Sequence, residues 1–148
     1  MQTKKTLRVG IVVGEHSGDL LGSELIKSLK NENDTDIELF GIGGPKLSEL
    51  GLKSEFDFKK INVMGLVEPL KNFRELSKLR KKLISLFEDK KIDYFIGVDS
   101  PDFNITIHKQ LKKKGHIKNI QLVSPSVWVW RQGRLKHIRN FIDMTICL

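Results

Sequence analysis

The stretch LRVGIVVGEHSGDLLGSELIKSLK, residues 7–30, decides the fold expected for this chain. Residues 7–13 form a short, largely apolar run that is typical of a buried strand. A turn between glycines follows, and then Leu21, Leu25 and Leu29 recur at a spacing of four, which predicts a helix over 19–30. We expect Ser17 to cap this helix and Asp19 to lie favourably in its first turn. The stretch therefore predicts a strand, a tight turn and a helix in direct succession.

The same alternation continues along the chain. Further strands are predicted at 37–43, 53–56, 93–100, 119–123 and 143–148, and helices after Gly44-Pro45, from near Pro69, at 104–115 and at 131–141. Gly115 is expected to end the helix at 104–115. This order predicts a single α/β domain over residues 1–148, built as a doubly wound, mostly parallel sheet with helices on both faces.

The composition limits the classes of protein to consider. The 148 residues include 26 Lys and Arg against 18 Asp and Glu, a formal net charge of +8. That surplus favours an anionic partner, either nucleic acid, a phosphorylated ligand or an anionic membrane surface, and it also fits an ordinary lysine-rich surface. No apolar run approaches the roughly 18 residues that span a bilayer, and Arg8 interrupts the apolar start, as a signal peptide would not. The single Cys147 suits a reducing cytosol.

Four unusual segments each follow a predicted strand. They are GEHSGD (14–19), GGP (43–45), DSPDFN (99–104) and SPSVWVWRQ (124–132). Ligands of open α/β sheets bind outside the carboxyl ends of the strands, so these segments are expected to meet at one rim. The sequence therefore predicts a ligand site there.

The first of these segments does not fit a phosphate loop. Its glycines match neither glycine fingerprint for nucleotides, and no Lys follows them. The carboxylates of Glu15 and Asp19 would repel a phosphate but would accept hydrogen bonds from hydroxyl groups, while Gly14 and the helix start offer backbone donors. The segment thus suits a polyol such as a sugar. The alternative is that both acids serve only as partners of the helix dipole.

The third segment contains the candidate general base. Asp99 follows the apolar strand YFIGV, where partial desolvation can raise the basicity of a carboxylate and allow it to take a proton from a bound hydroxyl. Asp102 and Asn104 could orient that base. Alternatively, they are plain turn and capping residues.

The fourth segment combines aromatic and cationic side chains. Aromatic faces suit sugar rings or acyl chains, and Arg131 suits a phosphate. Trp128 and Trp130 share one side of the segment, and we expect one in the core and one in the site. The four histidines are scattered, without Cys or His partners at ligand spacing, and are expected to be solvated or at helix ends. No metal is therefore expected.

Together, GExSGD, GIGGPKL, VMGLVEPL, GVDSPDFN and VSPSVWVWRQGR strongly resemble the lipid-A-disaccharide synthase family. The resemblance implies a GT-B type glycosyltransferase without a cofactor, which moves diacylglucosamine from its UDP derivative to diacylglucosamine 1-phosphate and releases UDP. It places the base on Asp99 and the conserved loop acid on Glu15. The substrate-binding candidates are Gly14, Glu15, Ser17, Asp19, Asp102, Asn104, Ser124, Trp130 and Arg131.

The resemblance also implies a place in the cell and a missing part. Family members work on lipids at the cytoplasmic face of the inner membrane, so an anionic membrane surface is an expected partner. The apolar cluster expected to contact it comprises Val63, Met64, Leu66, Val67 and Leu70, followed by several Lys and Arg. The alternative is a core helix with a solvated basic face. The family's second, UDP-binding domain has no counterpart in these residues, so we expect the chain alone to bind UDP poorly and make no disaccharide.

Two other functions fit the residues less well. A non-catalytic, basic α/β module that binds RNA would be indifferent to Asp99 and Glu15 and would bind in a salt-dependent way. A generic nucleotide-binding domain lacks its glycine fingerprint here. We therefore expect sugar and lipid substrates and no nucleic-acid partner.

Overall fold

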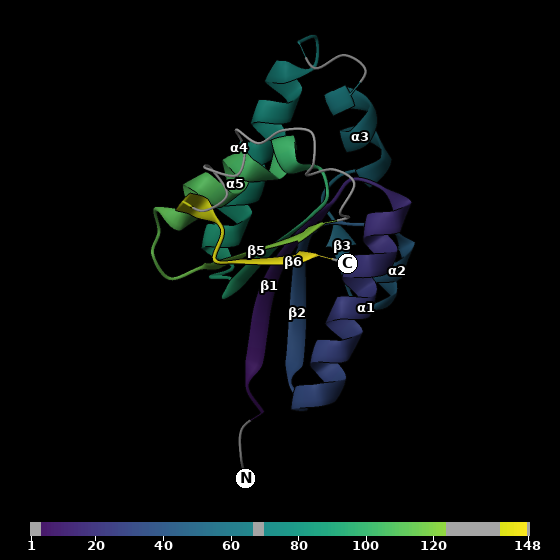
Figure 1. Ribbon diagram of the computed structural model, residues 1–148, viewed down its shortest axis with the longest axis vertical. Coiled ribbons are helices and arrows are strands. Elements are labelled where there is room, and N and C mark those ends of the chain that lie inside the picture. Colours follow the sequence, from purple (N-terminus) through teal and green to yellow (C-terminus); the bar gives the residue numbers. More distant parts are fainter. Residues whose placement is uncertain (1–3, 67–69, 124–139, 148) are drawn as a thin grey trace.

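A computed structural model describes residues 4–66, 70–123 and 140–147. Six strands form one sheet in the order β3-β2-β1-β4-β5-β6, and every pair is parallel (Figure 1). The elements, in chain order, are β1 Thr6–Val13, α1 His16–Asn33, β2 Asp36–Ile42, α2 Pro45–Glu49, β3 Lys53–Ser54, α3 Phe58–Leu66, α4 Phe73–Asp89, β4 Tyr94–Val98, α5 Pro101–Lys112, β5 Lys118–Val123 and β6 Met144–Cys147. The predicted doubly wound α/β class is confirmed, and the strand order is that of Rossmann-like folds.

Helices cover both faces of the sheet because side chains alternate along each strand. In β1, the side chains of Val9, Ile11 and Val13 belong to one apolar cluster, which α1 and α2 complete with Ile26 and Leu47. Val12 points to the opposite face, where buried residues of α3, α4 and α5 form a second cluster. The central strands β1 and β4 are therefore apolar on both sides, as expected for a parallel sheet between two helical layers.

The region between β3 and β4 departs from the prediction. Helix α3, Phe58–Leu66, was not expected, and α4 begins at Phe73 rather than near Pro69. Phe58, Ile61 and Met64 are buried in α3 at a spacing of three, so packing selects a helix in a sequence that also resembles a strand. In α4 the buried face consists of Leu76, Leu79, Leu83 and Phe87, whereas Leu86 lies partly exposed off this face.

Helix boundaries shift in the two helices that follow the central strands. Helix α1 starts at His16, three residues before the prediction, and α5 starts at Pro101 rather than at 104. Proline is well suited to the first turn of a helix because its φ is already fixed and its missing N–H would lack a partner there. Helix α5 ends at Lys112, and Gly115 takes a φ of +80° just beyond it. The predicted helix at 131–141 lies almost wholly outside the described residues, and the last predicted strand is confirmed as β6.

Candidate active site

The loops after β1 and β4 lie side by side at the carboxyl edge of the sheet. Val13 of β1 is paired with Val98 of β4, so the next residues, Gly14 and Asp99, leave the sheet at the same point. From this point the chain order runs towards β2 on one side and β5 on the other, which is where Rossmann-like sheets bind ligands. A side chain at position 14 would collide with the hydroxyl of Ser100, so glycine allows the two loops to touch. The predicted meeting of these loops is confirmed.

Glu15 and Ser17 lie together at the start of α1. Glu15 occupies the N-cap position with an extended backbone and makes no side-chain cap bond. The predicted capping role of Ser17 is therefore wrong, since Ser17 lies inside the first turn and donates its hydroxyl to Glu15 Oε1 at 2.8 Å. Ser17 is exposed and Glu15 partly so, which leaves carboxylate and hydroxyl oxygens available at the rim.

Asp19 has a structural position that the sequence did not indicate. Its side chain is 1% exposed, and both carboxylate oxygens accept backbone hydrogen bonds. Oδ1 accepts from Gly44 N at 2.8 Å and Leu47 N at 3.2 Å, and Oδ2 accepts from Lys46 N at 2.8 Å. The start of α2 is capped by no side chain of its own N-cap residue, so Asp19 supplies the negative charge there. Its position in the first turn of α1 is confirmed, and in this structure it faces α2 rather than the rim.

Asp99 and Ser100 form a strained turn at the end of β4. Both residues have positive φ, 47° and 40°, a conformation that costs a residue other than glycine about 1–3 kcal/mol. Asp99 is 7% exposed, and its backbone N–H donates to Leu122 O at 2.9 Å. Such strain gathers at functional sites, where the surrounding structure must enforce it.

The start of α5 shows how Asp102 and Asn104 differ. Asp102 is exposed in the first turn of the helix, whereas Asn104 is fully buried and donates its amide to the Asp99 carbonyl oxygen at 2.9 Å. Asn104 thus orients the Asp99 backbone, and neither residue is the N-cap, which is Ser100. Arg80 of α4 donates from Nε to Phe103 O at 3.2 Å and lies over the Phe103 ring. Burial lowers the pKa of Arg80, although the charge of Asp102 opposes that shift.

The remaining sequence candidates are placed as follows. Ser124, Trp128, Trp130 and Arg131 lie outside the described residues. Of the apolar cluster expected at a membrane, Met64 is only 8% exposed and packs in the core, so the prediction is wrong for that residue, whereas Leu70 is 92% exposed. Val63 and Leu66 belong to α3, but their side chains are not described, and Val67 is also outside the described residues.

One histidine is buried, although all four were expected to be solvated or at helix ends. His116 is exposed, as expected, and His16 lies at the first position of α1 with its ring edge-on to Phe58. His108, however, is 1% exposed and bonds to Asn119 and Gln121 of β5. Two features of the sequence could have indicated this buried polar cluster. Asn104 and His108 are four residues apart on α5, and Asn119 and Gln121 share one face of a buried strand.

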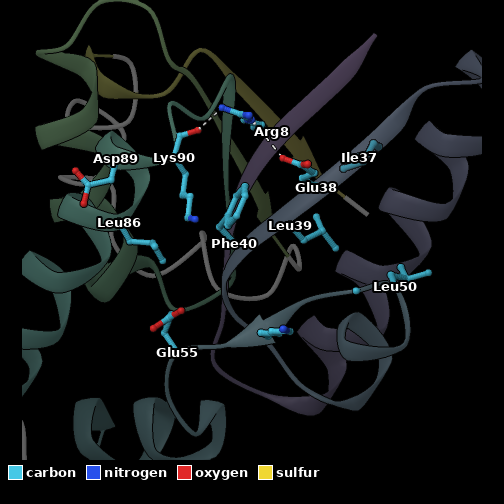
Figure 2. Close-up of a pocket in the computed structure, with 12 residues that line it drawn as sticks. Arg8, Ile37, Glu38, Leu39, Phe40, Leu50, Glu55, Leu86, Asp89 and Lys90 are labelled. Atoms are coloured by element: carbon cyan, nitrogen blue, oxygen red, sulfur yellow. Dashed lines mark hydrogen bonds and ion pairs between the residues drawn. The ribbon is translucent and has the colours of Figure 1, made fainter. Parts of the chain in front are cut away.

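A pocket of about 770 Å³ lies away from this rim (Figure 2). It borders β2 and the short strand β3, and its lining includes Arg8, Glu38, Phe40 and Lys90. Arg8 pairs with Glu38 at 3.3 Å and donates to Lys90 O at 3.2 Å, as the dashed lines show. None of the candidate residues that the structure describes lines this pocket, so the chemistry is not assigned to it.

Within 4–66, 70–123 and 140–147, no group of three or more His, Cys, Asp or Glu is arranged to hold a metal ion. No helix in the same ranges has both the length and the apolar character required to cross a membrane.

Comparison with known proteins agrees with the motifs. A sequence model of the family described as lipid-A-disaccharide synthetase matches residues 9–148. The lipid-A-disaccharide synthases of Acinetobacter baylyi and Pseudomonas fluorescens are each 46% identical over 96% of this chain, and that of Methylobacillus flagellatus is 43% identical over 95%. The chain spans 36%, 37% and 36% of the lengths of these three relatives. Since the family model matches nearly the whole chain, this chain belongs to the lipid-A-disaccharide synthetase family.

Proposed function

We propose that this chain forms the acceptor-side domain of an inverting glycosyltransferase that makes the disaccharide of lipid A. The donor would be UDP-diacylglucosamine and the acceptor diacylglucosamine 1-phosphate. The observation that carries this proposal is the strained Asp99–Ser100 turn beside Gly14 and Glu15, at the switch point of the sheet and within residues 9–148, which the family model matches.

In this proposal Asp99 is the general base. Its carboxylate takes the proton from the primary hydroxyl of the acceptor, and the resulting oxygen attacks the anomeric carbon of the donor. The bond from that carbon to the UDP oxygen breaks with its electron pair, so UDP leaves and the configuration inverts. A base must lie within hydrogen-bond reach of the proton that it takes, and a carboxylate at the rim of the sheet is suited to a bound hydroxyl.

Two side chains at the start of α1 suit the sugar. Glu15 and Ser17 are already hydrogen-bonded to each other at the start of α1, and together they offer acceptors and one hydroxyl to sugar hydroxyls. Asp102, exposed in the first turn of α5, can add a further acceptor. On the basis of the sequence alone, we propose Arg131 for the acceptor phosphate, Trp130 for a ring or acyl chain, and Ser124 as a further substrate-binding residue.

The donor site is assigned to the part of the family's length that this chain does not match. The loop after β1 carries Glu15, an acid that disfavours a diphosphate, and it lacks the glycine fingerprint of nucleotide sites. Transfer requires the donor carbon to be held against the acceptor oxygen, and such positioning supplies much of the rate. The enzyme therefore needs both parts.

The membrane surface is the proposed location. Leu70 and Phe73 are 92% and 61% exposed around the start of α4, and Lys71 and Arg74 are their neighbours in sequence. Figure 1 shows this end of α4 at the top of the view, far from the start of β1 at the bottom. Exposed apolar side chains with adjacent cations suit an anionic bilayer surface, so we propose peripheral binding at the cytoplasmic face of the inner membrane.

The general base is tested in a hybrid enzyme, in which this chain replaces the segment that it matches in the Acinetobacter baylyi relative. Asp99→Asn keeps the shape but cannot take a proton, so kcat for disaccharide formation should fall by about 10²–10⁴-fold with a smaller change in KM. The control is Asp36→Asn, an exposed residue at the start of β2, which should leave kcat unchanged. An Asp99→Asn hybrid with activity within a few-fold of the parent would remove Asp99 from the mechanism.

A further inference from the structure

A chain of buried side-chain amides and one imidazole lies directly beneath the Asp99 turn. The Asp99 carbonyl oxygen accepts two hydrogen bonds, from Asn104 Nδ2 at 2.9 Å and from Gln121 Nε2 at 3.1 Å. Gln121 Oε1 lies 2.9 Å from His108 Nε2, and His108 Nδ1 lies 2.9 Å from Asn119 Oδ1. These four side chains are each no more than 1% exposed. None of them can therefore contact a substrate at the rim. Two of them, Asn104 and Gln121, nevertheless bond to the backbone of the proposed base.

The arrangement determines which nitrogen of His108 carries the proton. Because the Gln121 amide nitrogen donates to Asp99, its oxygen must accept, so His108 donates through Nε2. Burial lowers the pKa of His108, outweighing the opposing effects of Asn119, Gln121 and Asp143, and favours a neutral ring with Nδ1 unprotonated. Turning the Asn119 amide by half a rotation would let its Nδ2, otherwise without a hydrogen-bond partner, donate to that nitrogen.

The backbone around these residues leaves room for them. A side chain at Gly97 in β4 would lie 2.5 Å from Gln121 Oε1 and 3.0 Å from the Asn104 amide atoms. Glycine at this strand position weakens the strand, and close approach by other groups is a recognised reason for it. The His108 ring in turn packs edge-on against Phe95, with centroids 4.8 Å apart. The imidazole is thus fixed in place by both packing and hydrogen bonds.

We propose that His108 is a positioning residue, which acts through Gln121 to hold the strained backbone of Asp99 so that its carboxylate faces the acceptor. This inference rests on the proposed role of Asp99 as the base. The turn requires such support, because two consecutive non-glycine residues with positive φ relax unless their surroundings fix them. A small misplacement of a catalytic group is enough to lower a rate by about 100-fold.

The kinetic test uses His108→Phe and Gln121→Met in the hybrid enzyme. Phe keeps the ring contact with Phe95 and removes both nitrogens, and Met is close to Gln in length but makes no hydrogen bond to Asp99. We expect each change to lower kcat about 10- to 100-fold with little change in KM, because neither side chain touches substrate. The control is Ser23→Ala, which removes a partly buried hydrogen bond to Leu20 O in α1, on the other side of the sheet. It should lower the melting temperature and leave kcat unchanged.

A cycle with the base separates positioning from general loss of stability. In an Asp99→Asn background, adding His108→Phe should lower kcat no further, since a support for the base has no effect on the rate once the base is gone. A multiplicative further loss would show that His108 acts by another route and would overturn the proposal. Unchanged kcat in both single variants, with only a lower melting temperature, would also overturn it while leaving Asp99 as the base.

A spectroscopic test does not depend on activity. Long-range proton–nitrogen NMR correlation on this 148-residue chain should find His108 neutral at neutral pH, protonated at Nε2 and unprotonated at Nδ1. In Gln121→Met the carbonyl carbon resonance of Asp99 should move, and in Ser23→Ala it should not. A His108 protonated only at Nδ1, or an Asp99 carbonyl that ignores Gln121, would refute the hydrogen-bond chain. If Asp99→Asn alone keeps full activity, the proposed function fails, and these spectra still report on the chain.

Discussion

Replacing Asp19 by Asn should destabilise the fold without selectively affecting the acceptor. The carboxylate accepts three backbone hydrogen bonds at the start of α2. The best orientation of Asn keeps its oxygen on Gly44 N and Leu47 N and places its NH₂ group against Lys46 N–H. One charge-assisted bond is then replaced by two facing donors, and the charge at the helix start is lost. A hydrogen bond to a charged group contributes about 1.5–3 kcal/mol, and the helix-end charge adds about 0.3–1 kcal/mol.

We therefore expect the free energy of unfolding to fall by about 2–4 kcal/mol, a large share of the 5–15 kcal/mol that holds a typical domain. For a chain of this size the melting temperature should drop by roughly 10 °C. Urea unfolding followed by circular dichroism measures the change as a lower midpoint at an unchanged slope. The matched control is Glu24→Gln on the same helix, which breaks only an exposed pair with Lys27 and should cost less than about 1 kcal/mol.

Two results would refute this reasoning about Asp19. A loss no larger than that of Glu24→Gln would mean that the three backbone groups find equivalent partners elsewhere. A normal stability combined with a raised KM for the acceptor in the hybrid enzyme would instead return Asp19 to the substrate site, as the sequence suggested.

Two further predictions concern pH and the membrane. Burial lowers the pKa of His108 in the folded chain, so the unfolded state takes up this proton at a higher pH than the folded state. The free energy of unfolding should therefore fall as the pH drops from the unfolded pKa near 6.5 towards the folded pKa. His108→Gln should remove that part of the pH dependence of urea unfolding, and an unchanged profile would contradict this prediction. The double change Leu70→Ser and Phe73→Ser should reduce sedimentation of the protein with anionic vesicles, and added salt should weaken this binding further. The control Met144→Ser changes an exposed residue of β6 and should leave vesicle binding unchanged. Equal binding by the two variants would place the membrane contact elsewhere.

The sheet could be predicted largely because its strands are short apolar runs separated by clear turns. Helix α3 could not, since its sequence contains β-branched residues and Gly65 and resembles a strand until Phe58, Ile61 and Met64 are seen packed against the sheet. The same packing explains why Met64 was wrongly expected at a membrane. Apolar residues near cations show the same sequence pattern whether they are buried in the core or exposed to a membrane. Only the tertiary structure decides which of these side chains are buried.

For the site, the shared rim could be inferred, because parallel strands bring their following loops to one edge, whereas the order of the strands in the sheet came only from the structure. The strain at Asp99 and Ser100 could not, since nothing in DSPDFN distinguishes a positive φ from an ordinary turn. Asp19 was misjudged because its partners are backbone groups 25–28 residues away, and such donors have no sequence signature. The burial of His108 was visible in principle, as it shares a helical face with the apolar Leu111.

The pairing of β1 with β4 also affects how this protein is made. Val13 and Val98 are paired across a long segment of chain, whose described residues form two strands and four helices. Closing so long a segment is entropically costly, and parallel pairings of this kind are slow to form. A growing chain can bury the apolar stripe of α1 against β1 and β2 early, but the rim does not exist until β4 has been synthesised and has docked. Until then the apolar edge of β1 lies open, so nascent chains stalled before β4 should depend most on chaperones.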